Sequence, residues 1–127
     1  NYPTDPPTPV YEGEVTVYHT VPFGLTDPVR RPVAPETYVD VSDIVEDKRA
    51  MLACHCSQKE WLDSSQGMDS YLNDMTDTLR QIGGLSGKFE YAEGWRRHSH
   101  QGFCAADADP LAKALGSKLF IDMESEV

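Results

Sequence analysis

The clearest pattern in the chain is an apolar stripe that recurs every three or four residues between positions 68 and 82. Its members are Met68, Tyr71, Leu72, Met75, Leu79 and Ile82. This spacing places them on one face of a helix, which Gly83-Gly84 are predicted to end. An earlier helix is predicted from about Asp43 to Trp61, capped by Asp40 or Ser42. Its expected inner face holds Ile44, Met51, Leu52, His55 and Leu62. The two helices should form an antiparallel hairpin joined near residues 64–67.

Alternating patterns predict strands on both sides of this hairpin. Residues 14–19 alternate with β-branched side chains, residues 38–41 form a short extended segment, and residues 119–121 are apolar. Aromatic and polar residues interleave over residues 89–100, which favours a strand or an extended segment. A short helix is predicted over residues 110–115, with Asp109 as its cap. Together the elements predict an α/β fold of short strands with a two-helix hairpin.

Prolines divide the 127-residue chain unevenly, since eight of nine lie within residues 1–35. We expect residues 1–12 to form an extended proline-rich arm, because proline fixes φ and lacks an N–H donor. The prolines between residues 20 and 36 predict a long surface loop. Residues 13–122 then form a single α/β domain segment, and residues 123–127 an acidic tail.

Charge narrows the possible functions. The net charge of −10 argues against general nucleic-acid binding or binding to anionic membranes. No apolar run approaches the roughly 20 residues of a membrane helix. Three cysteines make no disulfide framework, so reduced thiols in the cytoplasm are expected. Residues 36–77 carry a net −7, whereas residues 78–100 carry +2 and two histidines. The second segment is the natural place for an anionic or polar ligand.

Two short clusters contain metal-capable side chains. Cys54 and Cys56 flank His55, but positions i and i+2 of a helix point about 200° apart, so packing residues are the favoured interpretation. His98 and His100 would point to the same side of an extended segment. They could share a divalent metal with Cys104, His55 or an acid, or simply lie in a solvated loop, and the spacing selects no third ligand.

The adjacent cations Arg96 and Arg97 could grip a carboxylate or phosphate. In a strand they face opposite ways, so at most one enters a pocket. The other is expected to pair with a surface acid such as Glu90 or Glu93. Trp61 and Gln58 are interpreted first as packing and helix-terminal hydrogen-bonding residues. The chain contains no phosphate-binding glycine loop, G-x-S-x-G or H-E-x-x-H motif.

Three stretches, taken in order, resemble a known family. They are residues 38–44 (YVDVSDI), 48–58 (KRAMLACHCSQ) and 91–96 (YAEGWR). They look like the C-terminal part of the PIG-L/LmbE family of zinc-dependent N-acetylglucosaminyl deacetylases. Gly94-Trp95 replace the commoner Ala-Phe of that family. The longer strings at residues 57–62 and 94–98 suggest a subgroup associated with glucosamine-6-phosphate deaminase-like proteins. The resemblance covers about residues 10–105.

The resemblance implies a Rossmann-like fold and the hydrolysis of an N-acetyl group by a zinc-activated water with a carboxylate base. The family's A-H-P-D-D and P-D-H motifs are absent, so no catalytic residue or metal ligand is assigned here. Zinc ligands are expected outside this chain, which we interpret as the C-terminal portion of a longer protein. By the resemblance, Arg96 and His98 are substrate-binding candidates, and His55 and Gln58 are supporting residues.

The expected partners are an amino-sugar substrate and a missing N-terminal half or fused domain, with a possible homo-oligomer. Two other functions stay open. One is a non-catalytic carbohydrate-binding or oligomerisation module fused to amino-sugar enzymes. The other, less favoured, is a small metalloprotein that uses His98, His100 and Cys104.

Overall fold

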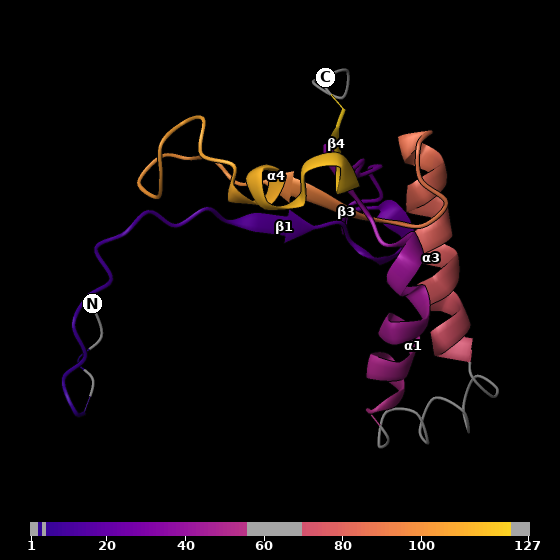
Figure 1. Ribbon diagram of the computed structural model, residues 1–127, viewed down its shortest axis with the longest axis horizontal. Coiled ribbons are helices and arrows are strands. Elements are labelled where there is room, and N and C mark those ends of the chain that lie inside the picture. Colours follow the sequence, from indigo (N-terminus) through magenta and orange to yellow (C-terminus); the bar gives the residue numbers. More distant parts are fainter. Residues whose placement is uncertain (1–2, 4, 56–69, 123–127) are drawn as a thin grey trace.

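The chain folds as a mixed α/β structure built on a four-stranded antiparallel sheet (Figure 1). The computed structural model describes residues 3, 5–55 and 70–122. The strand order is β1-β3-β2-β4. The strands are β1 (Tyr18–Thr20), β2 (Thr37–Asp40), β3 (Ala92–Arg97) and β4 (Leu119–Ile121). The described helices are α1 (Val45–Ala53), α3 (Ser70–Ser86) and α4 (Pro110–Leu115), with 3-10 turns at Phe23–Leu25, Ser42–Ile44 and Gly116–Lys118. The predicted mixture of helices and short strands is therefore confirmed, whereas the Rossmann-like arrangement implied by the resemblance stays a prediction.

Strands β2 and β3 form the centre of the sheet. Their register pairs Tyr38 with Gly94 and Val39 with Glu93. Because side chains alternate along a strand, these two pairs lie on opposite faces. One core cluster comprises Val21, Tyr38, Ile82 and Ala92, and the other comprises Val39, Val41 and Leu79. The loop after β1 packs on the first cluster, and α4 packs on the second.

The helices α1 and α3 stand side by side at one end of the sheet and run antiparallel (Figure 1). The stripe predicted for the second helix is buried at Leu72, Leu79 and Ile82. The hairpin expected from the sequence is thus present in the described part of both helices. Its connection at residues 64–67 lies outside the described residues, as do Gln58, Trp61, Leu62, Met68 and the tail at 123–127.

The first helix is shorter than predicted, and its phase differs. Residues 42–44 form a 3-10 turn, so α1 begins only at Val45 and ends at Ala53. This rotates the inner face, which buries Val45 and leaves Ile44 47% and Met51 71% exposed. His55 lies beyond the end of α1 and is also exposed. The predicted inner face was therefore wrong at these last three positions.

The second helix continues through Gly83-Gly84 to Ser86, so the predicted end was wrong. Gly83 does not stop the helix, because it is buried where α3 crosses the residues before β3. The turn comes at Gly87, whose φ of 63° suits glycine. The Ser86 hydroxyl accepts hydrogen bonds from the N–H groups of Lys88 and Phe89, both at 3.1 Å. These bonds fix the chain as it leaves the helix.

The strands predicted over residues 14–19 and 89–100 exist but are shorter, whereas β2 is displaced by one residue from the predicted 38–41 and β4 covers the predicted 119–121. Before β1, residues 14–17 are joined to the fold by backbone bonds such as His98 N–H to the Val17 carbonyl at 2.9 Å. The predicted helix over Pro110–Leu115 is confirmed, with Asp109 accepting from the Ala112 N–H at 3.0 Å. The described part of residues 1–12 has no regular structure and extends away from the sheet (Figure 1). Among the described residues, no helix is both long and apolar enough to cross a membrane.

The two adjacent glycines of α3 give a matched test of this packing. A Cβ on Gly83 would lie 2.5 Å from the Glu90 carbonyl oxygen, whereas a Cβ on Gly84 meets nothing within 4 Å. Gly83→Ala should lower the free energy of unfolding by about 1–3 kcal/mol through overpacking. Gly84→Ala should raise it by about 0.5–1 kcal/mol through helix propensity. Urea denaturation measures both, and equal effects at the two sites would contradict the packing described.

Candidate functional site

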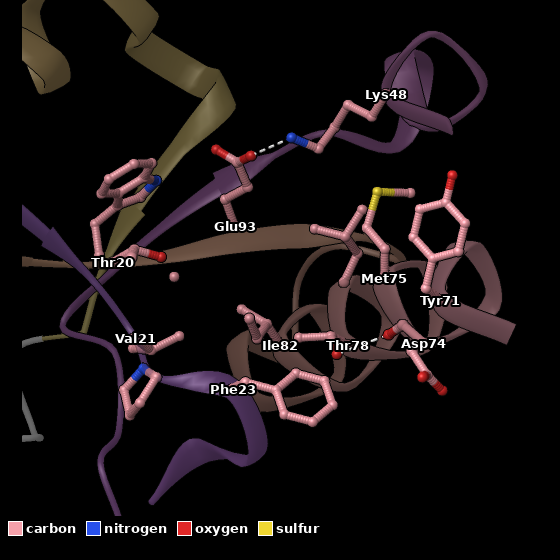
Figure 2. A pocket seen from close by; sticks show the side chains of 14 residues that line it. Thr20, Val21, Phe23, Lys48, Tyr71, Asp74, Met75, Thr78, Ile82 and Glu93 are labelled. Atoms are coloured by element: carbon pink, nitrogen blue, oxygen red, sulfur yellow. Dashed lines mark hydrogen bonds and ion pairs between the residues drawn. The ribbon is translucent and has the colours of Figure 1, made fainter. Parts of the chain in front are cut away.

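A groove of about 570 Å³ lies between α3, β3 and the loop after β1 (Figure 2). Its volume suits a small ligand. The wall is mostly apolar and is lined by Thr20, Val21, Pro22, Phe23, Lys48, Tyr71, Asp74, Met75, Thr78, Leu79, Ile82, Glu93, Gly94 and Trp95. Phe23 is 80% exposed at its edge. The groove thus combines aromatic surface with a few polar groups.

Its main charged feature is an ion pair between Lys48 of α1 and Glu93 of β3 (Figure 2). The Lys48 ammonium donates a hydrogen bond to Oε1 of Glu93. Both side chains are about one-third exposed or less, at 27% and 30%. Partial burial reduces solvent screening, so this pair should contribute more than a fully exposed one.

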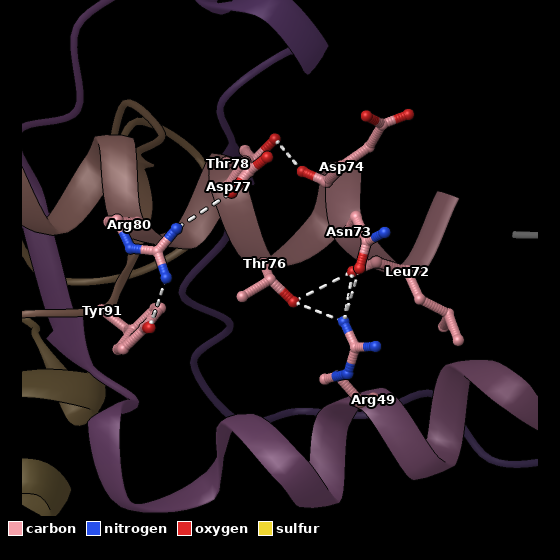
Figure 3. A network of polar contacts seen from close by, with 9 residues as sticks. All are labelled: Arg49, Leu72, Asn73, Asp74, Thr76, Asp77, Thr78, Arg80 and Tyr91. Atoms are coloured by element: carbon pink, nitrogen blue, oxygen red, sulfur yellow. Dashed lines mark hydrogen bonds and ion pairs between the residues drawn. The ribbon is translucent and has the colours of Figure 1, made fainter. Parts of the chain in front are cut away.

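A polar network holds α1 against α3 and so positions Lys48 (Figure 3). The Arg49 guanidinium, next in the chain, donates to the Leu72 carbonyl and to the Thr76 hydroxyl, both at 3.0 Å. Farther along α3, Arg80 donates to the Tyr91 hydroxyl at 2.7 Å. The second contact ties α3 to the residue that precedes β3. Hydrogen bonds therefore join α3 both to α1 and to the residue before β3.

A second hollow of about 320 Å³ adjoins the groove. It is lined by Lys48, Met51, Leu52, His55 and Met75, and it shares Lys48 and Met75 with the groove. The supporting candidate His55 therefore lies next to the candidate site, although it is exposed rather than on a packed helix face. The other supporting candidate, Gln58, lies outside the described residues.

The structure brings together the described parts of all three sequence stretches that carry the family resemblance. Residues 38–40 pair with residues 92–94 along β2 and β3. Just beyond, the Val41 N–H donates to the Tyr91 carbonyl at 3.1 Å, and the Tyr91 N–H donates to the Ser42 hydroxyl at 3.2 Å. Lys48 of the middle stretch binds Glu93 of the last. The three stretches thus contact one another, and the middle and last ones supply Lys48, Glu93, Gly94 and Trp95 to the groove lining.

Asp40 shapes the turn after β2 and does not cap α1, so the predicted cap was wrong: α1 begins after Ile44 with no side-chain cap hydrogen bond. Its Oδ1 accepts a hydrogen bond from the Ser42 N–H at 3.0 Å. Hydrogen bonds from Ser42 hold the pKa of the Asp40 carboxyl below its usual value; burial opposes them with a smaller effect, and the nearby Lys118 charge lowers the pKa by a still smaller one. The carboxylate form is therefore the one that stabilises this turn.

The substrate-binding candidates Arg96 and His98 are not among the described residues that line the groove. Arg96 Nε lies 3.1 Å from Oε1 of Glu36. His98 contacts His19 and lines a separate hollow of about 180 Å³ with His100 and Cys104, among others. Both candidates are exposed, and their role as substrate contacts stays a prediction.

The prediction that one of the two arginines pairs with Glu90 or Glu93 was wrong. Arg97 Nη1 lies 3.7 Å from Oδ2 of Asp109, and Arg96 binds Glu36 rather than Glu90 or Glu93. Glu93 instead faces α1, because it alternates with Arg96 across the sheet. Sequence reasoning also missed the Lys48–Glu93 pair. Its signal was opposite charge at two positions within the family-like stretches.

The described part of the chain contains no site with three metal ligands. No group of three or more His, Cys, Asp or Glu side chains is placed there to hold an ion. The thiols of Cys54 and Cys104 are free. The described residues therefore form no zinc site of the kind that the family resemblance implies.

Comparison with known proteins gives no relative: no protein-family model, curated protein or solved structure matches the chain. The candidate site thus stands on its geometry and on the sequence stretches that meet there.

The Lys48–Glu93 pair can be tested with a double-mutant cycle. Lys48→Ala, Glu93→Ala and the double variant should give a coupling energy of about 0.5–1 kcal/mol in urea denaturation, because the pair is partly shielded from solvent. The more exposed Arg80–Asp77 pair, at 57% and 71%, is the control. We expect a coupling there of about 0.3 kcal/mol. A coupling near zero for Lys48–Glu93 would contradict the described contact.

The role of Asp40 predicts a pH dependence. Because its pKa is lowered in the fold, the carboxylate contributes stability above its ordinary pKa, and this is lost as pH falls through the lower folded value. Asp40→Ala should cost about 1 kcal/mol at pH 7, through loss of the hydrogen bond from the Ser42 N–H, and progressively less below about pH 4. Urea denaturation at each pH measures this. Asp107 is exposed, so Asp107→Ala is the control and should change stability by less than about 0.5 kcal/mol. An equal cost of Asp40→Ala at pH 7 and pH 2 would refute the stabilising role of the Asp40 carboxylate.

Proposed function

We propose that this chain is the C-terminal segment of a metal-dependent hydrolase resembling the de-N-acetylases of N-acetylglucosamine-type sugars. In this role it completes the fold and supplies a substrate edge rather than the metal ligands. The observation that carries the proposal is that the three family-like stretches contact one another, and that Lys48 and Glu93 of the last two line the groove. Stretches that are far apart in the chain are expected to contact one another when they build a common site.

The groove has the chemistry that a sugar requires. Aromatic faces such as Phe23 and Trp95 suit the C–H face of a pyranose ring, while polar groups receive its hydroxyls. Lys48, Glu93 and Thr78 offer such groups at the wall. Arg96 and His98 would contact a more distant part of the substrate, since they lie outside the described groove lining.

The remaining parts of the enzyme would come from a missing N-terminal half or a fused domain. All pairings in the described sheet are antiparallel. The parallel strands of a Rossmann-like fold would therefore have to be supplied by the other half. Zinc would activate the water there, together with a carboxylate base. We place the assembled enzyme in the cytoplasm, with a homo-oligomer as one arrangement.

A second candidate function is a carbohydrate-binding or oligomerisation module fused to amino-sugar enzymes. The exposed Phe23 at the groove favours it, because an exposed aromatic ring can serve as a sugar platform without any reaction. This module would bind the sugar without the other half.

The test starts from the coding sequence upstream of residue 1 and uses the complete reading frame. We expect an in-frame His-Pro-Asp-Asp motif and release of acetate from an N-acetylglucosamine conjugate. Phe23→Ala should lower kcat/KM about tenfold through lost ring contact. Val29→Ala, 69% exposed on the same loop and outside the described groove lining, is the matched control.

Three outcomes separate the candidates. Acetate release that depends on Phe23 and not on Val29 supports the hydrolase. Sugar binding by the chain without acetate release from the complete protein supports the module. A complete protein that neither cleaves nor binds the sugar would contradict both.

A further inference from the structure

Two histidines from neighbouring strands meet on the surface away from the groove. His19 lies in the middle of β1, and His98 directly follows β3. Nε2 of His19 is 2.8 Å from Nδ1 of His98. The ring centroids are 4.9 Å apart, and the ring planes are inclined by 50°. Both residues are exposed, so solvent ions reach them.

The backbone fixes this approach. His19 pairs with Arg96, so His98, two residues later, is its diagonal neighbour on the same face. The His98 N–H donates to the Val17 carbonyl at 2.9 Å, which continues the β1–β3 pairing past the end of β3. Phe103 stands edge-on to the His98 ring, with centroids 5.4 Å apart. The two imidazoles are thus positioned by main-chain bonds and a ring contact.

We propose that His19 and His98 form a two-nitrogen clamp for a divalent transition-metal ion such as Ni²⁺ or Cu²⁺. The two nitrogens are 2.8 Å apart. If each lay about 2.05 Å from a bound ion, the angle between them at the metal would be roughly 86°. This is near the right angle between neighbouring ligands in tetragonal or octahedral complexes. A tetrahedral angle would need the nitrogens to separate to about 3.3 Å, so the present spacing favours Ni²⁺ or Cu²⁺ over Zn²⁺.

Binding would replace the hydrogen bond between the rings with two metal–nitrogen bonds. The hydrogen bond between the rings has one N–H donor and one lone pair. A metal takes a lone pair from each ring, so the proton of the donor ring moves to the other nitrogen of that ring, and both rings turn until their lone pairs converge on the ion. Exposed side chains permit that rotation, and water completes the coordination.

The two cations that precede His98 in the chain are each paired with an acid, which reduces their repulsion of a metal ion. Arg96 lies 3.1 Å from Glu36, and Arg97 lies 3.7 Å from Asp109. The whole chain carries a net charge of −10, which attracts cations at low ionic strength.

The clamp differs from the metal site that the sequence left open. That hypothesis joined His98 to His100 and Cys104, which line one hollow with it. In the structure the ring nitrogen nearest His98 belongs instead to His19. The two sites make different predictions for variants at positions 19 and 100.

Titration of the full chain with NiCl₂ in an isothermal calorimeter tests the clamp. We expect one ion per chain, and affinity weakened roughly a hundredfold in His19→Ala and in His98→Ala, because each loses one of two tethered ligands. Circular dichroism verifies folding, and His98→Gln is a second variant that keeps a polar side chain but should bind as weakly as His98→Ala. His55→Ala removes another exposed histidine and should leave the affinity unchanged.

The copper complex gives an independent readout. Its electron paramagnetic resonance spectrum should show coupling to two imidazole nitrogens in the native chain and to one in His19→Ala. Affinity lost in His100→Ala but kept in His19→Ala would overturn the clamp in favour of the site with His100 and Cys104. Absence of stoichiometric nickel binding, or loss of binding in His55→Ala alone, would also overturn it.

Discussion

The antiparallel pairing of β2 with β3 is the constraint on which the remaining structure depends. It joins residues 37–40 to residues 92–95, and the hydrogen bonds between Ser42 and Tyr91 extend it by one step. Its register turns Glu93 toward α1 and Tyr38 toward the loop after β1. A shift by one residue would exchange the two faces. The Lys48 contact and both core clusters would then be lost together.

Helix α3 packs against the end of this strand pair and forms one wall of the groove. It buries Leu79 in one cluster and Ile82 in the other, so the helix bridges the two faces at the end of the sheet. Gly83 allows the helix to touch the main chain before β3. The space left between α3, β3 and the loop at Phe23 is then bounded on two sides by tightly packed elements.

Local patterns in the sequence predicted the helices and strands, while the packed environment decided their ends. The stripe containing Leu72, Leu79 and Ile82 required only helical periodicity, and the Asp109 cap required only a short-range bond. The end of α3 depended on whether Gly83 meets another segment, which no local pattern contains. The same holds for the candidate site: the motifs indicated three stretches, but the Lys48–Glu93 and His19–His98 contacts depend on strand register.

Gly94 has a further consequence for the groove. A Cβ there would come within 2.6 Å of Pro35, so the side chain is absent where the loop before β2 lies flat on β3. The groove lining at this point consists of peptide atoms. Substitution of Gly94 would therefore disturb the packing against Pro35, so this part of the groove lining cannot readily change during evolution. Variation in what the groove accepts would instead arise at Phe23 and on the exposed turns of α3, where side chains can change without disturbing the sheet.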